Sequence, residues 1–209
     1  MKIIFFFLNF LLVLHSSLVH AEWLNGELPP FQKKISFSLI DQGQQAFSSQ
    51  QLEGRYSLIF FGYSTCSDIC PTSLQMAARV KKSLMASEPI NVVFITLDPV
   101  HDTSEKLADY LAGFDQDFIG LTGSQKEINN TASSFLVKYR KRTIKGKVND
   151  VFDHSGTSYL LDKSGKLLLS YPYATPPEKI IADITYLYKN GKNWISGRMS
   201  GAPHAEAHQ

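Results

Sequence analysis

Cysteine is scarce in this chain, with two residues in 209. Two cysteines are too few for a disulfide-stapled scaffold or for a structural zinc site built from cysteine alone. Charge is nearly balanced, with 21 Lys and Arg against 19 Asp and Glu. Because phosphate backbones bind clustered Lys and Arg and we find no long basic run, we expect no nucleic-acid partner. The content of 44% hydrophobic and 19% charged residues is that of a globular protein and excludes a largely disordered chain.

Long apolar runs are also rare, and the one at the N-terminus is short for a membrane span. After Lys2 it holds about a dozen mostly apolar residues, whereas a spanning helix needs about 20. We therefore expect residues 1–21 to be a secretory signal peptide that is cut after Ala21, and the protein to be exported, to the periplasm. The alternative is an uncleaved segment that anchors the protein, which is the one case in which we expect membrane association.

Strand and helix patterns alternate along residues 22–190, which we expect to form one domain. Aliphatic and aromatic runs predict strands, at 35–40, 46–48, 56–62, 90–97 and 118–121. Helical spacing or capping residues predict helices, at 71–84, 103–111, 124–135 and 176–190. A hairpin is predicted at 157–161 and 166–170, a long charged loop at 136–156, and a mobile tail at 191–209. This order predicts an α/β, thioredoxin-like fold with a mixed central sheet flanked by helices.

The two cysteines, Cys66 and Cys70, lie four positions apart where a predicted strand turns into a helix. If the turn is partly helical, both side chains share one face, and their sulfurs can meet each other or one metal ion. The positive end of the helix favours thiolate over thiol. A structural disulfide is the plainer interpretation, but closing a loop of about five residues would contribute only ~2 kcal/mol. We therefore expect a functional pair.

Function at this pair divides between metal binding and redox exchange. Paired thiolates are soft ligands that suit Cu(I), and an exported dithiol can equally exchange disulfides with thiol partners. A peroxidase-like role also uses a cysteine at a strand-to-helix turn, but no other residue argues for peroxide chemistry. The spacing favours a metal, because three intervening residues leave more room for an ion than the two of common dithiol oxidoreductases.

A histidine is the expected third ligand, and the predicted topology favours His154. It lies in a loop just before the predicted hairpin, and in a thioredoxin-like sheet that loop faces the cysteine turn. His101 is expected at the surface, and His204 and His208 lie in the predicted tail. Two thiolates and one imidazole leave a coordination position open. This disfavours structural zinc and suits an ion that is handed on.

Three segments of the chain together resemble the Sco/SenC family of copper-binding proteins. They are GYSTCSDICPT at 62–72, LDPVHDT at 97–103 and DHS at 153–155. The likeness spans about residues 30–190 and implies a thioredoxin-like fold. It also implies copper, as Cu(I) or Cu(II), carried by Cys66, Cys70 and His154, and its transfer to the dinuclear copper centre of cytochrome c oxidase.

The resemblance implies a copper metallochaperone whose partner is a copper-receiving oxidase subunit. The alternative is a periplasmic thiol–disulfide reductase that uses Cys66 and Cys70 as a catalytic redox pair. His154 separates the two, because the carrier requires it and the simplest reductase does not. Asp98 and Asp153 lie near the expected site, and the sequence leaves open whether they support it.

Overall fold

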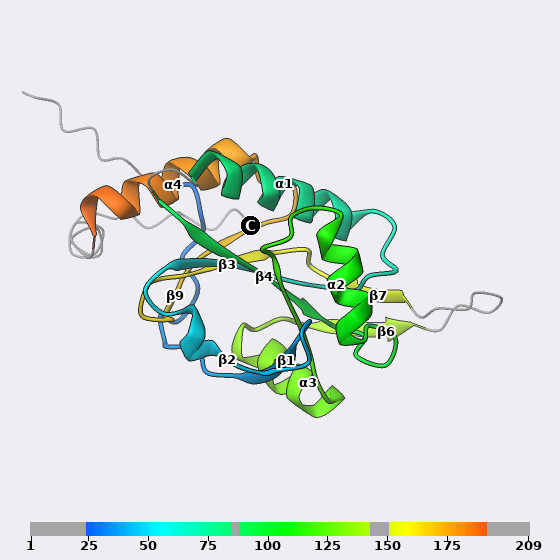
Figure 1. The fold of residues 1–209 in the computed structure, drawn as a ribbon. Coiled ribbons are helices and arrows are strands. Elements are labelled where there is room, and N and C mark those ends of the chain that lie inside the picture. Colours follow the sequence, from blue (N-terminus) through cyan, green and yellow to red (C-terminus); the bar gives the residue numbers. More distant parts are fainter. Residues whose placement is uncertain (1–23, 85–87, 143–150, 192–209) are drawn as a thin grey trace, which may run out of the picture.

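The computed structural model describes residues 24–84, 88–142 and 151–191 (Figure 1). The expected signal peptide, the histidines at 204 and 208 and nearly all of the expected tail lie outside these residues. Within them a seven-stranded sheet runs in the order β2-β1-β5-β4-β3-β8-β9, and β6 and β7 form a separate two-stranded sheet. The strands are β1 (Ser38–Asp41), β2 (Ala46–Ser48), β3 (Tyr56–Gly62), β4 (Ile90–Thr96), β5 (Ile119–Thr122), β6 (Tyr139–Arg142), β7 (Val151–His154), β8 (Ser158–Leu161) and β9 (Leu167–Tyr171).

The helices begin where the sequence supplies capping groups. They are α1 (Ile69–Leu84), α2 (Ser104–Ala112), α3 (Gln125–Ser134) and α4 (Pro177–Asn190), with a short 3-10 helix at Ser49–Leu52. Thr103 caps α2 by accepting a hydrogen bond from the backbone N–H of Lys106. Ser124 and Glu127 form a reciprocal capping box at the start of α3. Pro177 opens α4, where its missing N–H has no cost.

The sheet is mixed, as expected for the predicted α/β, thioredoxin-like fold, which is confirmed. Strands β3, β4 and β5 are parallel, whereas β8 runs antiparallel to β3 and β9 antiparallel to β8. Phe60 near the end of β3 pairs with Ser158 at the start of β8. The residues that follow β3 and β4 and those that precede β8 therefore meet at one edge of the sheet.

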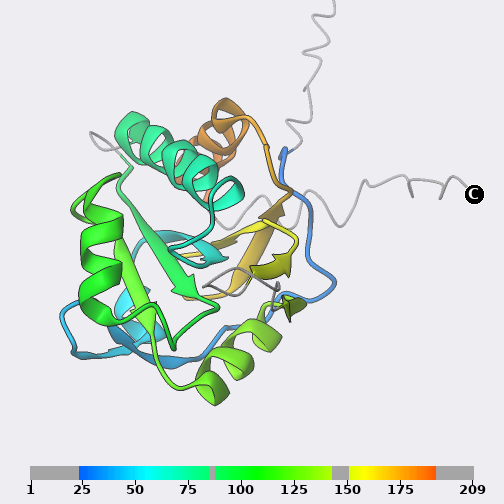
Figure 2. The same cartoon turned by 90° about the vertical axis from the view of Figure 1, so that its right-hand side faces the viewer.

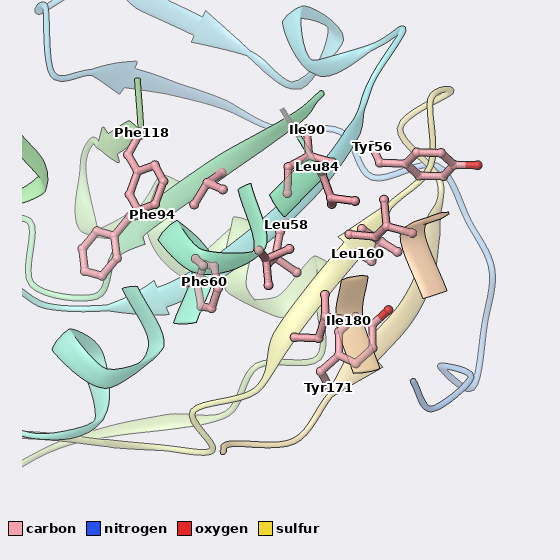
Figure 3. Packing of buried hydrophobic residues seen from close by; sticks show 14 of the residues in the cluster. Tyr56, Leu58, Phe60, Leu84, Ile90, Phe94, Phe118, Leu160, Tyr171 and Ile180 are labelled. Atoms are coloured by element: carbon pink, nitrogen blue, oxygen red, sulfur yellow. The ribbon is translucent and has the colours of Figure 1, made fainter. Parts of the chain in front are cut away.

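Alternation along the strands divides the core between the two faces of the sheet. Leu58, Phe60 and Phe94 belong to a buried cluster that includes residues of α1, α2 and α4. Figure 3 shows the side chains of this cluster from close by. Ile59 and Ile95 point to the other face, which α3 covers. Figures 1 and 2 agree that α1 and α4 lie together on one side of the sheet and α3 on the other.

The expectation of a loop across residues 136–156 is wrong at both of its ends. Residues 139–142 and 151–154 pair as the antiparallel strands β6 and β7. The first of them reads YRKR and carries no apolar alternation, so local propensity does not identify it. The pairing depends instead on tertiary contacts of single aromatic residues: Phe152 is buried and its ring lies 5.2 Å from that of Tyr63.

None of the helices in the described ranges has the length and hydropathy that a membrane span requires.

Gly62 gives a direct test of packing at the end of β3. A Cβ at this position would lie 2.7 Å from the Cys70 sulfur and 2.9 Å from the Phe94 ring. We expect Gly62→Ala to lower the free energy of unfolding by about 1–3 kcal/mol, because both neighbours must shift. Gly113→Ala is the matched control, since its new Cβ would meet only a backbone oxygen at 3.4 Å. Urea denaturation of both variants provides the measurement, and equal stabilities would contradict the packing described here.

Candidate metal centre

The cysteine turn joins the end of β3 to the start of α1. Cys66 precedes the helix, and the backbone N–H groups of Asp68 and Cys70 donate hydrogen bonds to its sulfur. Pro71 follows within the first helical turn, where a proline is well tolerated. The Cys66 sulfur thus receives backbone donors at the positive end of α1, where a negative charge is stabilised.

Cys66 and Cys70 are in contact, and both are free thiols. The Cys70 side chain donates a hydrogen bond to Cys66; this contact and, to a lesser extent, the backbone donors lower the pKa of Cys66 to about 5. The same contact, together with burial, raises the pKa of Cys70 far above its ordinary value. The pair therefore holds one proton between two sulfurs near neutral pH. A soft metal ion that replaced this proton would meet two sulfur donors.

Tyr63 links the cysteine turn to the strand that carries His154. Its side chain makes a hydrogen bond with Cys66, which helps to lower the pKa of that cysteine. Burial, and then the negative charge of Cys66, raise the pKa of Tyr63 to about 12, so the phenol stays a donor. Its ring packs against Phe152, two residues before His154. Tyr63 was not identified from the sequence, although it stands inside the motif at 62–72.

His154 ends β7 and lies at the same edge of the sheet as the cysteines. Burial lowers the pKa of His154, and the negative charges of Cys66 and Asp153 oppose that shift only in part. The imidazole is therefore neutral at pH 7, which is the form that binds metals. Its Nδ1 accepts a hydrogen bond from the backbone N–H of Gly156 at 3.2 Å, so the ring proton resides on Nε2.

A small cavity of about 10 Å³ is lined by both Cys70 and His154. In the part of the chain that the structure describes, however, no three side chains among His, Cys, Asp and Glu converge closely enough to hold a metal ion. The structure thus brings Cys66 and Cys70 into contact and leaves His154 nearby but outside ligating geometry.

Two buried aspartates follow β4, and one of them, Asp102, supports the cysteine turn. Asp102 is 1% exposed and accepts hydrogen bonds from the Ser64 backbone N–H, the Ser64 hydroxyl and the Thr96 hydroxyl, at 2.9, 2.5 and 2.7 Å. Asp98 is also buried and holds Nδ1 of His101 at 2.8 Å. Asp102 fixes the residues that lead into the cysteines, a role the sequence analysis missed. Its place in the motif at 97–103 was the available signal.

The remaining candidates lie apart from the cysteine pair. His101 is partly exposed and bound to Asp98, which agrees with the surface position expected for it. Asp153 forms an ion pair with Arg142, 2.5 Å from its Nε, on the exposed side of the β6–β7 hairpin. This ion pair is the main reason why the pKa of Asp153 is lowered.

Comparison with known proteins places this geometry in context. The family model described as SCO1/SenC matches residues 26–189. The "SCO2-like protein" of Rickettsia felis is 40% identical over 149 residues, which cover 69% of this chain and 72% of that protein. The solved structure of Bradyrhizobium japonicum ScoI with copper bound is 33% identical, with a TM-score of 0.67, and the match covers 73% of this chain and 98% of that one. Arabidopsis thaliana ScoI with copper bound is 27% identical, with a TM-score of 0.71 and coverages of 75% and 98%.

The shared proton predicts a sharp difference in reactivity between the two thiols. Because the thiolate is the nucleophile, alkylation of Cys66 by iodoacetamide should rise through pH about 5 and then level off. Cys70 should stay unmodified until the protein unfolds, because it is buried and protonated. Mass spectrometry after timed quenching identifies the modified residue.

The matched control for this experiment is Cys70→Ala. It removes the thiol that donates to Cys66, so the alkylation midpoint of Cys66 should move to higher pH. An unchanged midpoint in the variant, or equal reactivity of both thiols in the wild type, would disprove the proposed sharing of the proton.

Proposed function

We propose that this chain, which belongs to the SCO1/SenC family, is an exported copper metallochaperone. Copper is its cargo, bound by the sulfurs of Cys66 and Cys70 and by the imidazole of His154. The copper-receiving partner is a cytochrome c oxidase subunit with a dinuclear copper centre. Export to the periplasm fits this role, and an uncleaved N-terminal anchor would keep the protein at the membrane where the oxidase resides.

The observation that carries this proposal is the side-chain contact between Cys66 and Cys70, neither of which is in a disulfide, at the start of α1. Thiolates are the ligands that Cu(I) prefers. Copper binding displaces the shared proton. The copper cation then lies beside the negative charge on sulfur that the start of α1 stabilises. The copper-bound state of the Bradyrhizobium japonicum and Arabidopsis thaliana ScoI proteins supports copper as the metal.

His154 supplies the third donor in this proposal. A neutral imidazole needs no deprotonation at pH 7, so it adds a ligand without a proton penalty. To bind through Nδ1 the ring must leave the Gly156 N–H, and to bind through Nε2 it must move its proton to Nδ1. In this proposal either change accompanies an approach of the imidazole to the cysteines, since the three donors do not converge in the described part of the chain. Three donors leave one coordination position, through which an incoming ligand of the acceptor can attack.

Thiol–disulfide exchange is the second candidate, and the lowered pKa of Cys66 favours it. Cys66 is half-buried, its pKa is lowered to about 5, and a buried thiol lies beside it. Its thiolate would attack a partner disulfide and form a mixed disulfide. Cys70, after losing its proton, would then displace the partner as a thiolate and leave a Cys66–Cys70 disulfide. This reaction makes no use of His154, so substitution of the histidine separates the two functions.

Copper stoichiometry tests the cysteine pair. The reduced protein should bind one copper ion and the oxidised protein essentially none, because a disulfide removes both thiolates. Cys66→Ser and Cys70→Ser should each lose tight Cu(I) binding, and Ser67→Ala, in the same turn, should retain it. Equilibrium competition with a Cu(I) chelator measures the affinities. Equal uptake by the oxidised and reduced forms would refute a shared-cysteine site.

Substitution of His154 tests the third ligand. His154→Ala should weaken Cu(II) binding far more than Cu(I) binding, because two thiolates can hold Cu(I) alone while Cu(II) requires further donors, including nitrogen. His101→Ala is the matched control, since that ring is held by Asp98. Spectroscopic titration with Cu(II) gives the comparison. If His154→Ala keeps the wild-type Cu(II) spectrum and affinity, the histidine is not a ligand.

A further inference from the structure

The exposed face of the β6–β7 hairpin carries a concentrated positive charge. Alternation along a strand places Arg140 and Arg142 on one face of β6, opposite the face that Tyr139 occupies. Both arginines are exposed, and Lys138 is exposed one residue before the strand. Asp153 stands opposite Arg140 in the register with β7 and is exposed on the same side. These four residues are called the outer hairpin face.

The charges on this face are not balanced locally. The single carboxylate, that of Asp153, is held by Arg142 through contacts of 2.5 and 2.6 Å. Lys138 and Arg140 form no ion pair within the described ranges of the chain. Three cations and one carboxylate give this face a net charge of +2, which equals the formal net charge of all 209 residues. The other residues of the chain therefore sum to zero formal charge.

The outer hairpin face is close to the proposed copper ligands but lies on the opposite side of the two strands from His154. Tyr139 pairs with His154, and Arg140 pairs with Asp153, so the face begins one residue from the histidine. Cys70 and His154 line one small cavity, which places the end of the hairpin next to the cysteine pair. A protein that takes copper from this site must bring its own ligands to that cavity and will then lie over or against the hairpin.

We infer that the outer hairpin face docks a partner protein that carries carboxylates around its copper-accepting ligands. This inference rests on the proposed function, in which the copper is handed to a second protein. Complementary charges raise the rate of encounter and orient the partner, and a face next to the ligands orients it productively. An anionic membrane is the less favoured occupant, because a bilayer over this face would obstruct the acceptor's approach to the copper.

The test uses two labelled dithiol peptides that are identical except for their flanks, which are glutamates in one and glutamines in the other. Fluorescence anisotropy with the reduced, metal-free protein measures docking without copper. Stopped-flow transfer from the Cu(I)-loaded protein then measures delivery. At low salt the wild type should bind the acidic peptide more tightly and load it about tenfold faster, and salt should erase both advantages. The double variant Lys138→Glu, Arg140→Glu should lose both preferences.

The matched control is Lys33→Glu, Lys163→Glu, which makes the same charge change at exposed positions beside the β8–β9 turn, at the opposite end of the sheet. It should keep both preferences. Equal behaviour of the two double variants, or no preference in the wild type, would overturn the docking surface. The docking surface would also be overturned if the hairpin variant lost binding to phosphatidylglycerol vesicles but kept both peptide preferences. If the protein binds no copper but the anisotropy preference holds, the proposed function fails and the acidic docking surface stands.

Discussion

The hydrogen bond from the Cys70 thiol to the Cys66 sulfur is the contact that the surrounding structure maintains. Gly62 leaves the space that the Cys70 sulfur occupies, since any side chain there would collide with it. Asp102 holds Ser64, two residues before Cys66, by accepting two hydrogen bonds from it, and accepts a third from the Thr96 hydroxyl. Backbone donors of α1 complete the environment of the Cys66 sulfur. The result is a dithiol that carries one proton and is prepared for a soft cation.

The sheet topology explains why such a site forms at this position. Parallel pairing of β3 with β4 brings the cysteine turn and the aspartate-containing turn to one edge, and the antiparallel β8 begins at that same edge. His154 is the last residue of β7, a strand of the small second sheet. The cysteines are therefore fixed by the main sheet, whereas the histidine is carried by a hairpin.

Much of the fold and part of the site could be predicted from the sequence. The buried strand 56–62 and the dithiol spacing are local signals, and both were identified. The strands β6 and β7 were missed, because their pairing depends on distant aromatic contacts such as that of Phe152 with Tyr63. Asp102 was missed for a similar reason. In the sequence, a buried aspartate that accepts three hydrogen bonds cannot be told from an exposed, solvated aspartate. His154 was reached only through topology and resemblance.

X-ray absorption at the copper edge tests the central claim most directly, because it counts the ligands by element. For the copper-loaded wild type, our account predicts two sulfur neighbours and one nitrogen neighbour of imidazole type. His154→Ala should lose the imidazole signal and keep both sulfurs. A wild-type spectrum without two sulfurs, or an imidazole signal that persists unchanged in His154→Ala, would contradict the proposed copper site.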